Sequence, residues 1–334
     1  MTTKRPTTAT IYDIAKLAGV NPSTVSRALN NPGRINEKTE AKIKDAAKQL
    51  NYRVNPFARA LPTGKTKMIG LMLTDITNPV FFNAVRGAED AALRHGYTLV
   101  ISESQESTAL ETSTIQKVQA AVDGMVMVTT RLEDDQLRDL NEHKPVVLMN
   151  RVVKGIADVV PQIEPGIIEA IDHLASLGHK RLAYLSGPKN SWMNNTRWKL
   201  LMKNAVNKGM NIVEIGPNNP SLEAGRDTFE RVQAAGVTAV IAYNDLMAIG
   251  FMQEAIKRGI SIPKDLSIIG FDNIFGSDFT SPSLTTVAMP LTQTGDLAIE
   301  TILSLINKLE QNVKPANNLK TALILRNSTG VAKK

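Results

Sequence analysis

Short apolar segments alternate with helix-like segments along most of this 334-residue chain, and that alternation restricts the folds that the chain can adopt. A first series of apolar segments starts near residue 68 and comprises MIGLMLTD, YTLVISES, DGMVMVTT and PVVLMN. A second series starts after residue 165 and comprises RLAYLSG, NIVEIG, AVIAYN and LSIIGFD, followed later by LTTVAM and TALILR. Strands that alternate with helices favour a parallel sheet covered by helices on both faces. The two series therefore predict an α/β body of two lobes, each built on a doubly wound parallel sheet.

The beginning of the chain has a different pattern, that of three short amphipathic helices. Thr10 and Asp13 have the spacing of a capping box, and Gly19 is placed to end the first helix. Pro22 suits the first position of a second helix, and Asn36 suits the cap of a third. Two helices joined by a tight glycine turn and followed by a third form a helix-turn-helix, whose second helix can enter the major groove of DNA. The sequence therefore predicts an all-α helix-turn-helix head.

The charge of the chain is concentrated in this head. Residues 1–64 contain 11 Lys+Arg and 4 Asp+Glu, so the whole formal net charge of +7 lies there and the remainder is neutral. A basic module attached to a neutral body is typical of a nucleic-acid-binding protein. A solvated basic tail and a helical module for docking proteins are the alternatives, although the outward face of the second helix is rich in hydroxyl groups as well as basic.

Several other classes of protein are disfavoured by composition and spacing. The absence of cysteine rules out disulfides and thiol catalysis. Residues 1–10 are polar and no apolar stretch is long enough to cross a membrane, so we expect a cytoplasmic protein. The four histidines lack metal-site spacing, and TGKT at 63–66 lacks the first glycine of a phosphate loop because that position is Arg59. We therefore expect no enzyme, no cofactor and no metal site.

Seven short stretches of the sequence resemble the lactose-repressor/galactose-repressor (LacI/GalR) family of bacterial transcription factors. They are TIYDIAKLAGVNPSTVSRALN (10–30), NYRVNPFARALPTGKT (51–66), IGLMLTDITNPVFF, LGHKRLAYLSGP, NDLMAIG, IIGFDN and SLTTV, and they extend over nearly the whole chain. The resemblance implies a periplasmic-binding-protein-like body and a homodimer that binds a palindromic operator. It also implies a small effector, a sugar, pentose or nucleoside, that sets the DNA affinity. A solute-binding protein of a transporter, which has the same two-lobed body, is the alternative.

The resemblance also implies how the chain is divided. Residues 1–54 would form the helix-turn-helix domain, 55–65 a hinge helix or linker, and 66–334 the domain for effector binding and dimerisation. Within the last of these, lobe 1 would comprise about 66–164 and 290–319, and lobe 2 about 165–289 and 320–334.

The predicted DNA-contacting residues lie on the second helix, at the start of the first helix and in the linker. Arg27 can form two hydrogen bonds with guanine and Ser23 is a smaller reader of bases, whereas Thr24 and Ser26 suit phosphate contacts. In the family a linker leucine enters the minor groove, and Leu61 matches it, although Pro62 departs from the family pattern and a plain linker is the alternative. The full set is Thr10, Tyr12, Pro22, Ser23, Thr24, Ser26, Arg27, Asn30, Asn55, Ala58, Arg59 and Leu61.

The predicted effector-contacting residues follow the ends of strands, where ligands bind in open α/β sheets. By resemblance, Arg197, Asn244 and Asp272 align with hydroxyl-binding residues of the family. Asn78, Phe81, Asn150 and Arg151 resemble the pocket of ribose-binding proteins. Gln162 and Pro220 depart from the family pattern, Trp192 suits either a pocket wall or the lobe core, and Asp245 is expected only to cap its helix. The full set is Asp75, Asn78, Phe81, Asn150, Arg151, Trp192, Arg197, Asn244 and Asp272, which suits a polyol.

Overall fold

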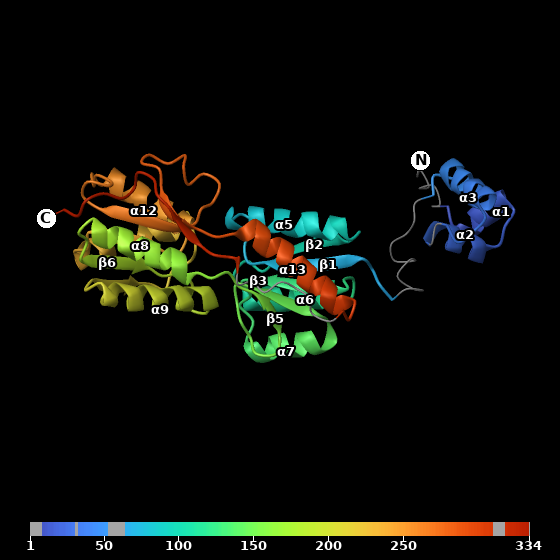
Figure 1. Cartoon of the computed structure of the whole chain (residues 1–334), viewed down its shortest axis with the longest axis horizontal. Helices are drawn as coiled ribbons and strands as arrows, with labels where there is room; N and C mark the ends of the chain where they lie inside the picture. Colours follow the sequence, from blue (N-terminus) through green and yellow to red (C-terminus); the bar gives the residue numbers. More distant parts are fainter. Residues whose placement is uncertain (1–8, 31–32, 53–63, 310–317, 334) are drawn as a thin grey trace, which may run out of the picture. The chain divides into compact units, whose positions relative to one another are not determined.

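The computed structural model describes residues 9–30, 33–52, 64–309 and 318–333 (Figure 1). The chain divides into two compact units, Met1–Lys67 and Met68–Lys334. In the part of the chain that is described, no helix is both long enough and apolar enough to span a membrane.

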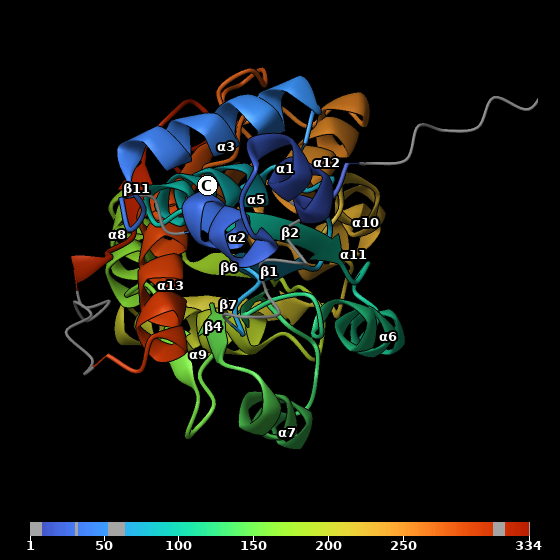
Figure 2. The same cartoon turned by 90° about the vertical axis from the view of Figure 1, so that its right-hand side faces the viewer.

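The first unit contains the three predicted helices, which are confirmed as α1 (Ile11–Ala18), α2 (Pro22–Asn30) and α3 (Glu37–Gln49). The capping box of α1 is present, and Gly19 ends the helix in the left-handed conformation at φ 67°. Ile14, Val25 and Ile43 contribute one fully buried side chain from each helix to a small common core. Figure 2 shows the three helices packed beside one another. The three helices thus stabilise one another through a shared core, and the polar face of α2 does not contribute to that core.

The first lobe of the second unit is a five-stranded parallel sheet in the order β2-β1-β3-β4-β5. Its strands are β1 (Met68–Leu73), β2 (Thr98–Glu103), β3 (Gly124–Val128), β4 (Val146–Met149) and β5 (Ala157–Val159). Alternate strand residues point to opposite faces, which α5 (Val80–Arg94) and α13 (Leu291–Ile306) cover on one side. The helices α6 (Thr108–Val118) and α7 (Asp134–His143) cover the other side.

The second lobe is a six-stranded sheet in the order β11-β10-β9-β8-β6-β7. Its strands are β6 (Arg181–Leu185), β7 (Asn211–Ile215), β8 (Ala239–Ala242), β9 (Ser267–Asp272), β10 (Thr285–Ala288) and β11 (Ala322–Ile324). The helices around it are α8 (Glu164–Ser176), α9 (Trp192–Asn207), α10 (Leu222–Asp227), α11 (Phe229–Ala235) and α12 (Asp245–Lys257). Tyr184, Phe251 and Phe271 are the largest fully buried side chains of its core.

Two features of the sheets differ from the prediction. The short strand β5 was not predicted, because three residues carry no recognisable pattern. The last strand, β11, was predicted, but it pairs antiparallel to β10 and so forms an antiparallel edge of an otherwise parallel sheet. The prediction of two doubly wound lobes is confirmed.

The helix α13 returns from the second lobe to pack against α5 on the first (Figure 1). The contact is so close that a Cβ atom on Gly87 would lie 1.9 Å from the carbonyl oxygen of Thr292, and one on Gly295 would lie 2.1 Å from that of Ala84. Glycine is therefore required at both positions. In each sheet the order reverses beside one strand, β1 or β6, and ligands bind outside the carboxyl ends of strands at such a point.

Candidate functional site

A narrow cleft lies between the two lobes, where strand ends of both sheets meet. It encloses about 40 Å³ of open space, well below the roughly 300–1,000 Å³ of a typical ligand pocket. The first lobe contributes Thr74, Asn78, Val80, Phe81, Ala84, Glu106, Val128, Thr129, Arg131 and Asn150. The second contributes Met193, Arg197, Pro220, Tyr243, Asn244 and Asp272, and Met289 and Leu291 complete the wall before and at the start of α13.

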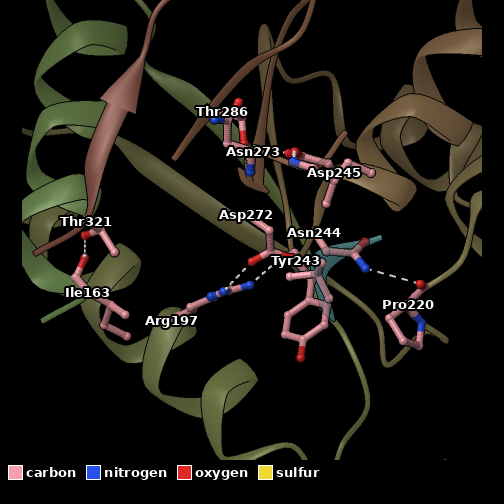
Figure 3. Close-up of polar contacts among 12 residues, drawn as sticks. Ile163, Arg197, Pro220, Tyr243, Asn244, Asp245, Asp272, Asn273, Thr286 and Thr321 are labelled. Carbon is pink, nitrogen blue, oxygen red and sulfur yellow. Dashed lines mark hydrogen bonds and ion pairs between the residues drawn. The ribbon is translucent and has the colours of Figure 1, made fainter. Parts of the chain in front are cut away.

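An ion pair forms the centre of the second-lobe wall. Arg197 Nη2 donates to Asp272 Oδ1 at 2.9 Å, and Nη1 donates to the carbonyl of Tyr243 (Figure 3). The guanidinium lies 4.3 Å from the centre of the Phe271 ring, and its Nε is buried without a partner. Burial raises the pKa of Asp272, and Arg197 offsets part of that rise. This wall therefore presents an unused donor beside a carboxylate whose second oxygen has no described partner.

Two consecutive residues at the end of β8 differ in their relation to the cleft: Asn244 lies on the wall, whereas Asp245 does not. Asn244 Oδ1 caps α12 by accepting from Met247 N at 2.9 Å, while Nδ2 donates to the carbonyl of Pro220 at 3.2 Å (Figure 3). The expectation that Asp245 only caps α12 was wrong, because Asn244 already occupies the cap position. Asp245 is buried instead and accepts from Ile274 N, Ser277 Oγ and Thr286 Oγ1 at 2.9, 2.6 and 2.6 Å. Burial, with a smaller contribution from nearby Asp272, raises its pKa to about 7.

A second ion pair stands on the first-lobe wall. Arg131 Nε donates to Glu106 Oε2 at 2.7 Å and Nη1 donates to the carbonyl of Thr129 at 2.8 Å. Close by, Asn78 Oδ1 accepts from the backbone N–H of Val80 at 3.1 Å. Asn150 lines the same cleft, and its Oδ1 is buried without a partner. Both walls of the cleft thus carry polar atoms that have no partner within the described residues.

Several residues that line this cleft have a strained backbone conformation with a positive φ. Residues other than glycine rarely adopt a positive φ, which costs about 1–3 kcal/mol when the conformation is sparsely populated and is concentrated at functional sites. Four such residues follow or end strands and line the cleft, namely Glu106 (φ 58°), Thr129 (56°), Asn150 (58°) and Asp272 (101°), and two more, Gln105 (49°) and Asn273 (54°), are their neighbours in the chain. Their clustering supports a functional role for the cleft independently of the side-chain contacts.

Six of the nine predicted effector-contacting residues lie on the wall: Asn78, Phe81, Asn150, Arg197, Asn244 and Asp272. Asp75 does not, because its carboxylate accepts from the backbone and hydroxyl of Thr77 at 2.8 and 2.6 Å in a tight turn. Arg151 does not, because the carbonyls of residues 130 and 132 and the carboxylate of Asp134 bind its guanidinium.

Trp192 also lies off the wall. It packs against the apolar core of the first lobe, and Met193, one residue further along α9, lines the cleft in its place. Met193 and Arg197 are four residues apart on α9 and share one helix face, whereas the side chain of Trp192 points about 100° away from that of Met193.

The sequence prediction missed several wall residues, among them Thr74, Glu106, Thr129 and Arg131. All four lie within three residues of the end of β1, β2 or β3, so a systematic search of every strand end would have found them. The resemblance pointed to Arg151, and Arg131 was not among the predicted residues.

A larger hollow of about 800 Å³ lies between α6 and α7 on the first lobe. Its floor is formed by Ile115, Leu132 and Leu140, and exposed polar side chains such as Asp139 and His143 form its rim. Among the described residues, none of the buried polar atoms that lack a partner lines it. The chemistry of ligand binding is therefore concentrated in the smaller cleft between the lobes.

In the head, the predicted base-reading residues lie on the open face of α2. Ser23 and Arg27, four residues apart, are exposed, while Val25 and Ala28 are buried. Pro22, Thr24 and Ser26 are half-buried, Asn30 ends α2, and Tyr12 on α1 is 69% exposed. The Thr10 hydroxyl is engaged in the capping box, where it donates to Asp13 Oδ2 at 2.7 Å. The predicted linker contacts Asn55, Ala58, Arg59 and Leu61 lie outside the described residues.

A helix-turn-helix head on a two-lobed body with a polar cleft defines a ligand-responsive DNA-binding regulator. Comparison with known proteins agrees: the family described as "Bacterial regulatory proteins, lacI family" matches residues 10–55, and the family described as "Periplasmic binding protein-like domain" matches residues 171–329. The chain is 34% identical to the HTH-type transcriptional regulator DegA of Bacillus subtilis (strain 168), over 96% of this chain and 98% of the relative.

Two solved structures are similar to most of this chain. The lac repressor dimer bound to operator and the anti-inducer ONPF has a TM-score of 0.86 and 25% identity, and the match covers 97% of this chain and 100% of that one. A LacI family transcriptional regulator of Enterococcus faecium with bound ribose has a TM-score of 0.71 and 26% identity, over 80% of this chain and 100% of that one. The protein thus belongs to the lacI family of bacterial regulatory proteins. It is a DNA-binding transcriptional regulator, and the alternative of a transporter's solute-binding protein is rejected because the matched DNA-binding head has no place in it.

Proposed function

We propose that this regulator is a repressor that binds a palindromic operator as a homodimer, and that a small uncharged polyol bound in the cleft between the lobes controls its affinity for DNA. One observation carries the effector part of the proposal. Arg197 on the second lobe and Asn150 on the first line the same cleft, and each has a buried polar atom without a partner, Nε and Oδ1 respectively. A buried polar atom without a partner is unfavourable, so a ligand that bonds to both atoms is stabilised and joins the lobes.

A pentose or a nucleoside suits this cleft best. Donors and acceptors come in arginine–carboxylate pairs that can bond to adjacent hydroxyl groups, and Phe81 offers an apolar surface. A similar regulator of E. faecium binds ribose, which supports the same class of ligand for this chain.

The size of the cleft indicates how effector binding is coupled to the affinity for DNA. An open space of about 40 Å³ does not admit a sugar, so the lobes must part to let it enter and then close on it. A ligand shifts an equilibrium only through its different affinity for the two states, and such coupling is typically about 1–3 kcal/mol, or about 5- to 150-fold in affinity.

The dimeric part of the proposal rests on the DNA-binding head. One helix-turn-helix reads only a few base pairs, so useful specificity requires two heads on a two-fold symmetric site. The lac repressor structure, similar over 97% of this chain, is a dimer on its operator. Since the target is chromosomal DNA, we place the protein in the cytoplasm.

The test uses the full chain. DNA sequences are selected from a random library by their binding to the protein, and the affinity for the selected sequence is measured by fluorescence anisotropy at several salt concentrations. The proposal expects inverted repeats and a 5- to 150-fold change in affinity on addition of D-ribose or adenosine. An asymmetric selected site would contradict the dimer. An affinity for DNA that neither D-ribose nor adenosine changes at saturating concentration would contradict the effector class.

A further inference from the structure

Two ion pairs face the same cleft from opposite lobes. Glu106 and Arg131 belong to the first lobe, and Arg197 and Asp272 to the second. No other wall residue within the described ranges carries a charge. The charges of the wall therefore cancel.

The first-lobe pair has room to bind a ligand. The side chain of Arg131 is only 3% exposed, and its Nε and Nη1 are engaged, whereas Nη2 makes no hydrogen bond to the residues that the structure describes. Glu106 offers its second carboxylate oxygen in the same way and is 23% exposed. Burial by itself lowers the pKa of Arg131, but Tyr243 on the second lobe and Glu106 together raise it above its usual value. Tyr243 and Arg131 line the same cleft from opposite lobes.

Arg131 is also held firmly in place. Glu111 on α6 is fully buried and accepts hydrogen bonds from Arg131 N at 3.0 Å and from the hydroxyl of Thr130. From the other side, Arg151 donates to the carbonyls of Thr130 and Leu132. A recognition group whose supporting loop is fixed on both sides loses little entropy on binding.

We propose that the Glu106–Arg131 pair binds the effector from the first lobe, and that the balance of charge between the two ion pairs makes the cleft select uncharged polyols over anionic ligands with the same skeleton. This inference rests on the proposed function. An uncharged hydroxyl can donate to Glu106 and accept from Arg131 without disturbing either ion pair. A phosphate group would bring an unbalanced charge into a buried site, which is strongly unfavourable.

The experiment measures binding to the full chain by isothermal titration calorimetry with two matched pairs of compounds. These are D-ribose with D-ribose 5-phosphate, and adenosine with adenosine 5′-monophosphate. In the unaltered protein, the uncharged member of at least one pair should bind at least about tenfold more tightly than its phosphorylated partner.

Two variants separate recognition from structure. Arg131→Met should weaken binding of the uncharged compound about tenfold or more, because hydrogen bonds to a charged group are lost. Glu106→Gln leaves Arg131 without its carboxylate, so the affinity ratio of phosphorylated to uncharged compound should rise about tenfold. A purely structural role would lower both affinities and leave that ratio unchanged. Arg138→Met, at an exposed arginine of α7 paired with Asp135, is the matched control and should change nothing.

Each outcome decides a different statement. Preference of the unaltered chain for the phosphorylated compound, or an unchanged ratio in Glu106→Gln, would overturn the inference and leave the cleft as the effector site. Failure of the unaltered chain to bind either uncharged compound would overturn the effector class of the proposed function. Thermal unfolding of each variant shows whether the fold is kept, and Glu106→Gln, at a half-buried position, provides the decisive ratio if Arg131→Met does not fold.

Discussion

The ion pair between Arg197 and Asp272 leads to a quantitative prediction about stability. Both side chains are at most 8% exposed, and each is the other's charged partner. Removing one partner of a buried pair leaves an uncompensated charge and typically costs about 3–5 kcal/mol. In Asp272→Ala, Arg197 keeps its bond to the Tyr243 carbonyl and its contact with Phe271, so the lower end of that range, about 3 kcal/mol, is expected.

Two further variants test the same ion pair: one removes the arginine, Arg197→Met, and the other combines both substitutions. Arg197→Met leaves Asp272 buried without its arginine, and burial then favours the protonated carboxyl group, so its cost should increase with pH. In the double variant neither charge remains, so its loss of stability should be smaller than the sum of the two single losses by about 2 kcal/mol or more.

Urea denaturation provides the measurement. Both tryptophans of the chain, Trp192 and Trp198, lie on α9 on either side of Arg197, so their fluorescence reports unfolding at the site itself. The exposed pair Lys203–Glu164 is the matched control, and its single variants should each cost at most about 1 kcal/mol. The idea that the pair acts as a buried unit would be refuted by two results together. Each single substitution, at Arg197 or Asp272, would lower the free energy of unfolding by less than about 1 kcal/mol, and the two losses would add up in the double variant.

Three further predictions follow from other parts of the structure. Arg27→Ala should cost about 1–3 kcal/mol on the selected operator and remove the preference at one base pair; anisotropy showing an equal loss on random DNA would make Arg27 a phosphate contact. Since the pKa of Asp245 is raised from 3.8 to about 7 in the folded chain, its stabilising contribution is present below about pH 4 and is lost as the pH rises through 7. The free energy of unfolding, measured with urea from pH 5 to 8, should therefore fall relative to that of Asp245→Asn, and parallel profiles would exclude this titration. Gly295→Ala should cost about 1–3 kcal/mol in the same assay, because its Cβ would lie 2.1 Å from a backbone oxygen, whereas Gly70→Ala, with side-chain contacts at 3.4 Å, should cost less.

Local sequence patterns determined the individual elements. The capping box at Thr10 and the glycine at position 19 act within one helical turn, so the limits of α1 follow from adjacent residues alone. The apolar strands of both lobes are likewise continuous runs, and their alternation with helices is sufficient to predict parallel doubly wound sheets. The antiparallel pairing of β11 with β10 could not be predicted in this way, since it depends on where a long connection brings the last strand.

The candidate cleft was predictable only in part. Asn150, Asn244 and Asp272 follow or end strands, and a general rule about parallel sheets places such residues beside a ligand. The rule does not say what else competes for each side chain. Asn244 turned out to serve its own helix as well as the wall, and Asp75 to be engaged in its own turn.

The choice between two arginines shows what the tertiary structure alone decided. Arg151 and Arg131 both follow strands of the first lobe, and nothing in the local sequence distinguishes a cleft-facing guanidinium from one that supports a loop. The carbonyls of residues 130 and 132 bind Arg151, and Glu106 at the end of another strand holds Arg131 at the cleft. The orientation of a long charged side chain depends on the hydrogen-bond partners that it can reach, and here those partners come from segments about 20 to 25 residues away. The sequence by itself therefore determined the elements and the edge of the sheets where a ligand binds, whereas the packed fold decided which charges face that ligand.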